Sequence, residues 1–327
     1  MTPRTEEFER RAEPFRRELI AHCYRMLGSA SEAEDQVQET MLRAWRAYDR
    51  FDDQLASFRT WLYRIATNVC LTSLEGARRR PLASSFVARA EDPEADLIPS
   101  LDVPWLQPLP DRLIASGSVD PATTVAVHGS VRLAFVAAMQ YLPARQRAVL
   151  ILRDVLEFSA FEVADILTTT PAAVNSALQR ARARLEEFSS GEEQIEDQLD
   201  PAHRALIDQY IAAFERADVS AITRLLAHEV VMEMPPVPLW FVGPDHYSQF
   251  IARVFRLLGT DWRMVPTSAN GQPAVGAYVR GDDGLYHSHT VQVFSVSKSK
   301  IQSNVVFGFG DPSLFELCGL PLSIGDR

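Results

Sequence analysis

Three polar side chains near the start of the chain are spaced so that they share one face of a helix. Asp35, Gln38 and Glu39 stand at positions i, i+3 and i+4, and Leu42 follows at i+7. Carboxylates and an amide are suited to hydrogen bonds with a partner helix that carries arginine. The pattern therefore indicates a protein-docking face, and the alternative interpretation is a solvated acidic face without a partner.

The segment 141–185 carries the signals of two helices joined by a tight turn. Ser159 and Glu162 form a capping-box signature for the first helix, and Thr170 with Pro171 marks the start of the second. The pattern predicts a helix-turn-helix, and a plain helical hairpin is the alternative.

The second helix of this pattern presents polar side chains on its outer face. Outward positions near the N-terminus of a recognition helix meet base edges, and flanking arginines suit phosphates. The outward residues are Ala172, Asn175, Ser176 and Gln179, and the flanking arginines are Arg180, Arg182 and Arg184. Because the outward side chains are small, we expect DNA shape and backbone contacts to contribute to recognition.

The segment 58–80 combines aromatic, polar and basic side chains. Trp61 belongs to an apolar stripe at helical spacing, and such a stripe most often seats a helix on a core. The remaining positions carry polar or basic groups: Arg59, Arg64, Thr67, Asn68, Arg78, Arg79 and Arg80.

Helices are the elements that must position these side chains. Ser31 and Glu34 form a capping-box signature at the start of the helix that carries the docking face. A polar loop from Tyr48 to Ser57 separates that helix from one that we expect from about Phe58 to Leu74.

In this order the blocks resemble the extracytoplasmic-function (ECF) sigma factors, promoter-recognition subunits of bacterial RNA polymerase. The resemblance covers residues 8–188. It implies that Asp35, Gln38, Glu39 and Leu42 dock on a coiled coil of the polymerase core. It also implies that the segment 58–80 binds the promoter −10 element and holds a flipped-out base through the residues named above. The helix-turn-helix would then read the −35 element.

The segment 81–129 is rich in Pro, Ser and Asp and lacks sustained periodicity, which indicates a linker. It contains an apolar island, VPWLQPLP, at 103–110. An exposed Trp flanked by apolar residues usually covers a surface, so we expect Trp105 and Leu106 to make an interdomain contact. A polyproline-like spacer is the alternative.

The last third of the chain changes pattern from helices to a meander of strands, which indicates an α+β domain. It resembles the SnoaL-like domains of the nuclear-transport-factor-2-like superfamily, cones that often enclose a pocket. Candidate pocket residues are Trp240, His246, Tyr278, His287 and His289, with Met234 as an apolar wall. His287 and His289 should share a strand face. General-base catalysis, ligand binding and protein contact are all open for this domain.

Charge and composition narrow the class of protein. The net charge of −10 argues against a general nucleic-acid binder. Residues 1–80, however, hold 14 Arg against 13 acidic residues, so the acidity lies mostly outside the two helical blocks. We therefore expect weak DNA binding by the chain alone, with the polymerase core delivering it to promoters. The three cysteines lie far apart, and the sequence shows neither a membrane span nor a signal peptide, which favours the cytoplasm.

We interpret the chain as multidomain, with two all-α sigma domains and an α+β cone-shaped SnoaL-like domain. The expected bounds are 8–80, 130–188 and 201–327, with linkers at 81–129 and 189–200. The expected function is promoter-specific transcription initiation, modulated in cis by the C-terminal domain. The expected partners are core RNA polymerase and promoter DNA, with a small-molecule ligand of the C-terminal domain left open. We expect no catalysis, cofactor or metal.

Two rival interpretations belong to other classes of protein. One is a SnoaL-like isomerase, cyclase or ligand sensor fused to a DNA-binding regulator. The other is a simple helix-turn-helix repressor, but a repressor does not require a segment such as 58–80 that binds a single DNA strand.

Overall fold

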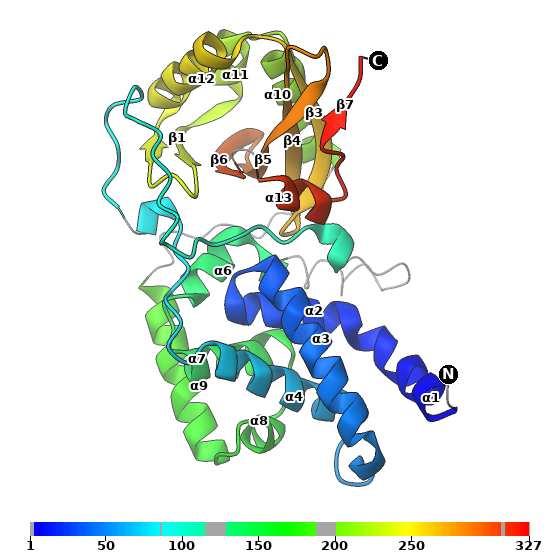
Figure 1. The fold of residues 1–327 in the computed structure, drawn as a ribbon. Coiled ribbons are helices and arrows are strands. Elements are labelled where there is room, and N and C mark those ends of the chain that lie inside the picture. The colour runs from blue at the N-terminus through cyan, green and yellow to red at the C-terminus, as the bar shows by residue number, and fades with distance from the viewer. Residues whose placement is uncertain (1–2, 86, 115–128, 188–200, 309–310, 327) are drawn as a thin grey trace. The chain divides into compact units, whose positions relative to one another are not determined.

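The computed structural model describes residues 3–85, 87–114, 129–187, 201–308 and 311–326. These residues form two compact units (Figure 1). The helical unit holds the residues up to Arg80 and those from Leu113 to the end of the second helical block. The mixed unit holds residues 81–112 and those of the C-terminal third.

The helical unit is built from two groups of helices. The first group is α1 (Pro3–Ala12), η1 (Glu13–Phe15), α2 (Arg16–Leu27), α3 (Ala30–Ala47), η2 (Tyr48–Arg50) and α4 (Phe58–Ser73). The second group is α6 (Leu133–Met139), α7 (Ala144–Leu150), the π-helical turn η5 (Ile151–Val155), α8 (Ala160–Ile166) and α9 (Pro171–Glu186). None of the described helices combines the length and the apolar character that crossing a bilayer requires.

Helix starts follow the capping signals at most positions. The capping box of Ser159 and Glu162 is present at α8, and Thr170 caps α9 with Pro171 in its first turn. The capping box expected at Ser31 and Glu34 is wrong. Ser29 caps α3 instead by accepting from the Glu32 backbone N–H at 3.3 Å, so the helix begins directly after the chain turns at Gly28.

The mixed unit is a curved sheet with helices packed against it (Figure 1). Its helical elements are η3 (Ala83–Ser85), η4 (Asp111–Leu113), α10 (Pro201–Glu215), α11 (Val219–Leu225), α12 (Pro244–Leu258) and α13 (Pro312–Leu317). Its strands are β1 (Leu226–Glu233), β2 (Trp240–Val242), β3 (Trp262–Ala269), β4 (Gln272–Arg280), β5 (Tyr286–Ser297), β6 (Lys300–Phe307) and β7 (Ser323–Ile324).

The strand order is β2-β1-β6-β5-β4-β3, with β7 paired to β5. All pairs are antiparallel except β1 with β6. The α+β architecture that the sequence predicts is therefore confirmed. The five longer strands were predictable from alternating apolar residues, whereas β2 and β7 are too short to show a period.

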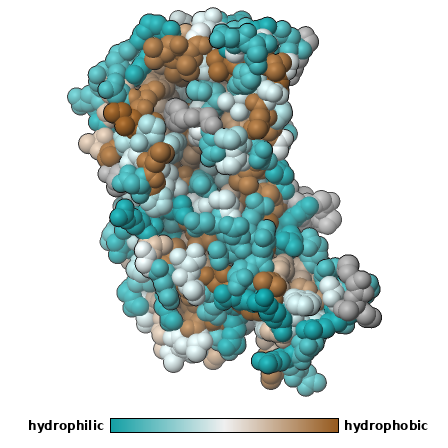
Figure 2. All heavy atoms as spheres, in the orientation of Figure 1, coloured by the Kyte–Doolittle hydropathy of each residue, from teal (hydrophilic) through white to brown (hydrophobic). Residues whose placement is uncertain are grey.

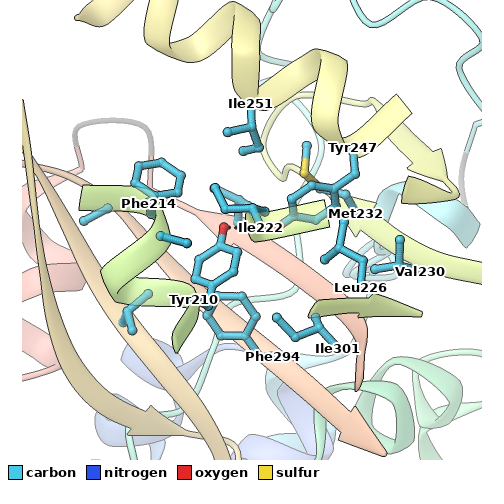
Figure 3. Close-up of a cluster of buried hydrophobic side chains, with 14 of the residues drawn as sticks. Tyr210, Phe214, Ile222, Leu226, Val230, Met232, Tyr247, Ile251, Phe294 and Ile301 are labelled. Atoms are coloured by element: carbon cyan, nitrogen blue, oxygen red, sulfur yellow. Dashed lines mark hydrogen bonds between the residues drawn. The ribbon is translucent and has the colours of Figure 1, made fainter. Parts of the chain in front are cut away.

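Aromatic side chains fill the space between the sheet and the helices of the mixed unit (Figure 3). Phe214 of α10 meets Phe255 and Trp262 edge to face, and Tyr210 meets Phe294 of β5 in the same way. Edge-to-face pairs add to the stabilisation that burial provides. On the outside of the unit, hydrophobic residues gather near α12 (Figure 2), where Leu257 is 61% exposed.

Candidate nucleic-acid and protein interfaces

Helix α3 presents the predicted docking face to solvent. Asp35 and Gln38 are exposed, and Leu42 is 40% exposed. Glu39 is half-buried and accepts from Arg43 Nε at 2.6 Å one turn later. The opposite side of the helix packs into the core through small and apolar side chains, namely Ala30, Ala33, Val37, Met41 and Ala44. The helix is therefore seated firmly while its acidic face stays available.

Helix α4 carries the aromatic-basic residues on two different faces. Arg64 and Asn68 are exposed, whereas Trp61 is half-buried with its ring centroid 4.8 Å from that of Phe51. Thr67 is fully buried and its hydroxyl lies 3.0 Å from His22 Nε2. The prediction that Thr67 contacts DNA is therefore wrong for this conformation, because the residue falls on the side of α4 that packs on α2.

The three consecutive arginines after α4 differ in their surroundings. Arg78 is exposed. The Arg79 guanidinium lies over the Tyr141 ring, 4.3 Å from its centroid, and Arg80 forms an ion pair with Glu32 of α3. Two of the three cations therefore already have partners within the helical unit.

Helix α9 exposes all seven residues that the sequence assigns to DNA: Ala172, Asn175, Ser176, Gln179, Arg180, Arg182 and Arg184. Its other face is buried through Val174, Leu178 and Ala181. Arg182 is held by a bidentate contact to Asp154 at 2.6 and 2.8 Å. Because that carboxylate is partly exposed, the pairing is weak enough for a phosphate to compete with it.

Helix α8, the first of the helix-turn-helix, packs directly against α4 within the helical unit. Arg59 lies over the Phe158 ring at 4.6 Å, and Arg64 Nη1 is 3.3 Å from Asp165 Oδ2. Thr60 donates to Glu162 Oε1 at 3.4 Å. Arg59 and Arg64, which we predicted to contact the −10 element, therefore contact residues of the helix-turn-helix segment 141–185 instead.

Two buried arginines join the same two blocks at a second place. Arg147 of α7 donates to the Met26 carbonyl at the end of α2, to Gln140 Oε1 at 2.7 Å, and to the Gln140 and Leu142 carbonyls at 3.2 Å. Arg25 donates to the Ser130 carbonyl at 3.2 Å and to its hydroxyl at 2.5 Å. Burial lowers the pKa of both guanidinium groups to about 10.

The pocket residues that the sequence suggests for the C-terminal domain do not come together. Trp240 donates to the Val87 carbonyl at 3.1 Å, and His246 Nδ1 lies 3.1 Å from the Val242 carbonyl. Tyr278 is buried and donates to the Pro321 carbonyl at 2.8 Å. His287 is exposed beside Asp283, at 2.9 Å.

Only His289 of that set lines the cavity of the mixed unit. The pairing of β4 with β5 shifts register between Ala277 and Tyr278, so that Thr290 and Ser288 oppose them and His289 is the extra residue. A β-bulge of this kind breaks the two-residue period. The expectation that His287 and His289 share a face is therefore wrong. Burial lowers the pKa of His289.

The cavity has polar residues that the sequence did not single out as a group. Tyr210 and Tyr247 (Figure 3) approach one another hydroxyl to hydroxyl at 2.9 Å. Tyr210 donates to Gln292 Oε1 at 3.1 Å, and Tyr247 accepts from Asn304 Nδ2 at 2.7 Å. One sequence feature could have pointed to this polar group. Gln292 and Asn304 each place an amide inside an apolar strand segment, TVQVF and SNVVF. Their convergence depends on the pairing of β5 with β6.

Residues 81–112, part of the expected linker, belong to the mixed unit. Leu109 exchanges two hydrogen bonds with Asn270, at 2.7 and 2.9 Å. Arg253 donates to the Pro93 and Ala95 carbonyls at 2.9 and 2.7 Å. Trp105 and Leu106 are buried, and the Trp105 indole donates to the Ser100 carbonyl at 2.8 Å.

Glu233 at the end of β1 fixes the start of this segment. It is buried and accepts from the Ser84 backbone N–H at 2.8 Å and from the Ser84 hydroxyl at 3.0 Å. Burial raises the pKa of its carboxyl group, and the hydrogen bonds from Ser84 oppose that shift. The segment is thus held by polar contacts near both of its ends.

Within the described ranges no three His, Cys, Asp or Glu side chains gather as metal ligands would. His289, the one histidine at the cavity, lies beside Trp262, with ring centroids 5.4 Å apart.

Three family models match the chain in the order of its blocks. Sigma-70 region 2 matches residues 12–80, Sigma-70 region 4 matches 132–185, and the SnoaL-like domain matches 207–304. The chain is 45% identical over 320 residues to the ECF RNA polymerase sigma factor SigG of Mycobacterium tuberculosis, covering 97% of this chain and 85% of the relative.

The ECF sigma factor SigJ of the same organism is a second relative, at 26% identity over 280 residues, with coverage of 84% and 81%. Its crystal structure superposes with a TM-score of 0.61 at 22% identity and covers 97% of this chain and 99% of that one. The two molecules therefore share the fold along nearly their whole length, including the C-terminal domain.

Proposed function

The chain belongs to the ECF RNA polymerase sigma factors, and we propose that it directs core polymerase to specific promoters. The single observation that supports this most is the pairing of two surfaces in one helical unit. One is the acidic face of α3, and the other is the fully exposed outer face of α9. A promoter-recognition subunit needs both, whereas a repressor needs only the second. We place this activity in the cytoplasm, where polymerase and DNA are.

Core binding is assigned to Asp35, Gln38, Glu39 and Leu42. The acidic and amide groups accept from guanidinium donors of the polymerase, and Leu42 adds apolar area beside them. A groove of about 350 Å³ between α1 and α3, lined by Phe8, Met41 and Trp45 among others, lies on the same helix. It offers the partner an apolar anchor beside the charged face.

Binding of the −10 element is assigned to α4 and the arginines after it. Arg64, Asn68 and Arg78 are exposed, while Trp61 offers a half-exposed ring. A ring of this kind stacks with an unpaired base, and the arginines neutralise the strand that carries it. Arg59, Arg64, Arg79 and Arg80 contact the strand once their present partners release them.

Binding of the −35 element is assigned to α9. Asn175 and Gln179 offer amides to base edges, with Ala172 and Ser176 beside them, and Arg180, Arg182 and Arg184 contact phosphates. The Thr170 side chain accepts from the Ala173 backbone N–H at 3.2 Å and so fixes the first turn of the helix.

Promoter binding requires the helical unit to open. The −10 and −35 elements are centred about 25 base pairs apart, which is about 85 Å of B-form DNA. Helices α4 and α8 touch in the closed unit, so their blocks cannot occupy both elements at once. We infer that core polymerase separates them and thereby frees Arg59 and Arg64 for DNA.

Modulation in cis is assigned to the mixed unit, because it binds the chain segment that connects the two DNA-reading blocks. Residues 81–112 lie between α4 and α6 in sequence and are held by Glu233, Asn270 and Arg253. While the segment stays bound, less chain is free to span the distance between the promoter elements. The C-terminal domain therefore favours the closed protein.

An isomerase or cyclase activity is not proposed. The relatives that cover most of the chain are named as sigma factors.

Association with core polymerase tests the proposal. Asp35→Arg with Glu39→Arg should reduce co-purification with core at least tenfold, because both replaced carboxylates lie on the docking face. Glu229→Arg with Asp282→Arg is the matched control, since it changes the net charge equally at exposed sites on the mixed unit. Equal co-purification of both double variants would contradict the assignment.

A further inference from the structure

A cavity of about 230 Å³ lies inside the mixed unit between α12 and the sheet. Most of its wall is apolar, formed by side chains such as Phe214, Met232, Ile251 and Trp262 (Figure 3 shows the first three). A cavity of about 150 Å³ accommodates benzene. In proportion, this one accommodates about nine non-hydrogen atoms. Its size suits a small ring system and not a polymer segment.

One end of the wall is polar, and its hydrogen bonds can be counted. Asn304 Nδ2 donates to Tyr247 Oη at 2.7 Å and to Gln292 Oε1 at 3.1 Å, which uses both of its hydrogens. Tyr210 donates to Gln292 Oε1 at 3.1 Å. Tyr247 then donates its proton to Tyr210 Oη, 2.9 Å away. With Gln292 Oε1 as the shared acceptor, Asn304 must turn Nδ2 toward it, because the reverse orientation would place a carbonyl oxygen against Gln292 Oε1.

This network leaves one acceptor over. Asn304 is only 1% exposed, and its Oδ1 has no hydrogen-bond partner. Among the described residues that line the cavity, Asn304 alone has a buried side-chain polar atom without a hydrogen-bond partner. A buried acceptor without a donor is costly, so a molecule that brings an N–H or O–H group to this end of the cavity gains a hydrogen bond.

The wall bears no free ionic group to attract a charged molecule. Arg253 is the one Arg, Lys, Asp or Glu among the lining residues. Its guanidinium is already bound to the Pro93 and Ala95 carbonyls and lies 3.8 Å from Glu94. An occupant that entered with a charge would lose its hydration without compensation.

We propose that this cavity binds a small, neutral, mostly apolar ring compound that carries one hydrogen-bond donor, with Asn304 as the group that selects for the donor. The cavity thereby makes the sigma factor a receptor for such a compound. The inference rests on the proposed function only in its consequence for transcription.

Binding is coupled to the segment between the two DNA-reading blocks, because that segment forms part of the wall. Leu97 lines the cavity, and the carbonyls just before it are bound by Arg253, which also lines it. Arg256 adds a bidentate contact to Glu94 at 2.7 and 2.8 Å. An occupant that contacts Leu97 binds the docked segment better than the released one, so occupancy favours docking.

Indole and benzofuran are the matched probes for the full-length chain. Both have nine non-hydrogen atoms and nearly the same shape, but indole donates an N–H where benzofuran has an ether oxygen. Isothermal titration should give an affinity for indole at least tenfold higher than that for benzofuran. Equal affinity for the two probes, or no binding of either at millimolar concentration, would overturn the proposal.

Two variants separate the role of Asn304 from general damage to the fold. Asn304→Leu should reduce the affinity for indole to that for benzofuran, whereas Gln302→Leu, the same kind of change on β6 outside the cavity wall, should leave the tenfold preference intact. If Asn304→Leu fails to fold, the comparison of indole with benzofuran on the unaltered chain still decides.

Limited proteolysis tests the coupling. Trypsin cleavage at Arg89, an exposed position in the docked segment, should slow at least threefold at saturating indole and remain unchanged with benzofuran at the same concentration. Bound indole without such protection would show a receptor that is not coupled to the segment. Binding and protection are measured without polymerase, so their failure is distinct from loss of core binding by the chain.

Discussion

Replacing Arg147 with Met should loosen the joint between the two helical blocks. Arg147 is 4% exposed and donates to four acceptors, including the Met26 carbonyl of α2. A hydrogen bond from a charged donor stabilises a fold by about 1.5–3 kcal/mol. The Met side chain has a similar volume but donates nothing.

The removed charge offsets part of this loss. Burial lowers the pKa of Arg147 from its usual range to about 10, which corresponds to a desolvation penalty of about 3 kcal/mol that Met does not incur. Taking the lower value of the range for all four hydrogen bonds, the net loss is about 3 kcal/mol. This corresponds to about a hundredfold in the equilibrium of local opening.

Hydrogen exchange followed by mass spectrometry measures this opening segment by segment. In Arg147→Met the protection of α6, α7 and the end of α2 should fall about a hundredfold, while strands β4 and β5 of the mixed unit keep theirs. Arg145→Met is the control, because Arg145 is exposed on the same helix. Protection of α6 and α7 unchanged within threefold would refute the reasoning about the buried guanidinium.

Three further predictions concern pH, the docked segment and promoter choice. Burial lowers the His22 pKa from 6.5 to about 3, so His22 contributes stability that is present above pH 6.5 and lost as the pH falls toward 3. Between pH 7 and 5, the free energy of unfolding should therefore drop by about 2 kcal/mol more in wild type than in His22→Gln. If urea titrations give the same drop for both proteins, the prediction is contradicted. Glu233 has a raised pKa, so its charge opposes folding as the pH rises above 4.5. Glu233→Gln should melt at a higher temperature than wild type at pH 7.5, with a gap that narrows toward pH 4.5, and a lower melting temperature at pH 7.5 would count against it. Gln179→Ala should change the preferred −35 sequence, whereas Arg182→Ala should weaken binding to all promoters and reduce its salt dependence, and identical binding profiles for the two variants would exclude the assigned register of α9.

The helices and their starts were largely predictable, because local chemistry determines them. Ser159 with Glu162 and Thr170 with Pro171 each act within one turn of the helix that they start, so the local sequence is enough to predict them. Ser31 failed as a cap because Ser29, two residues earlier, already accepts the first free backbone N–H. The exposed outer face of α9 followed from helical period alone.

The cavity and the joint between the blocks were not predictable, because each depends on elements far apart in the chain. Asn304, Gln292, Tyr210 and Tyr247 come from four different elements and meet only when the sheet has formed. Arg147 is buried and Arg145, two residues earlier on the same helix, is exposed. The local sequence does not distinguish the two arginines. The bulge at His289 depends on how β5 pairs with β4, which one strand does not encode.

Transcription in vitro from fragmented genomic DNA tests the central claim most directly. Core polymerase with the full-length chain should start transcripts at sites that share one −10 motif and one −35 motif, when the 5′ ends are sequenced. Core with the Asp35→Arg and Glu39→Arg double variant should lose those starts, and core with the Glu229→Arg and Asp282→Arg control should retain them. Starts that are indistinguishable from those of core polymerase alone would contradict the account.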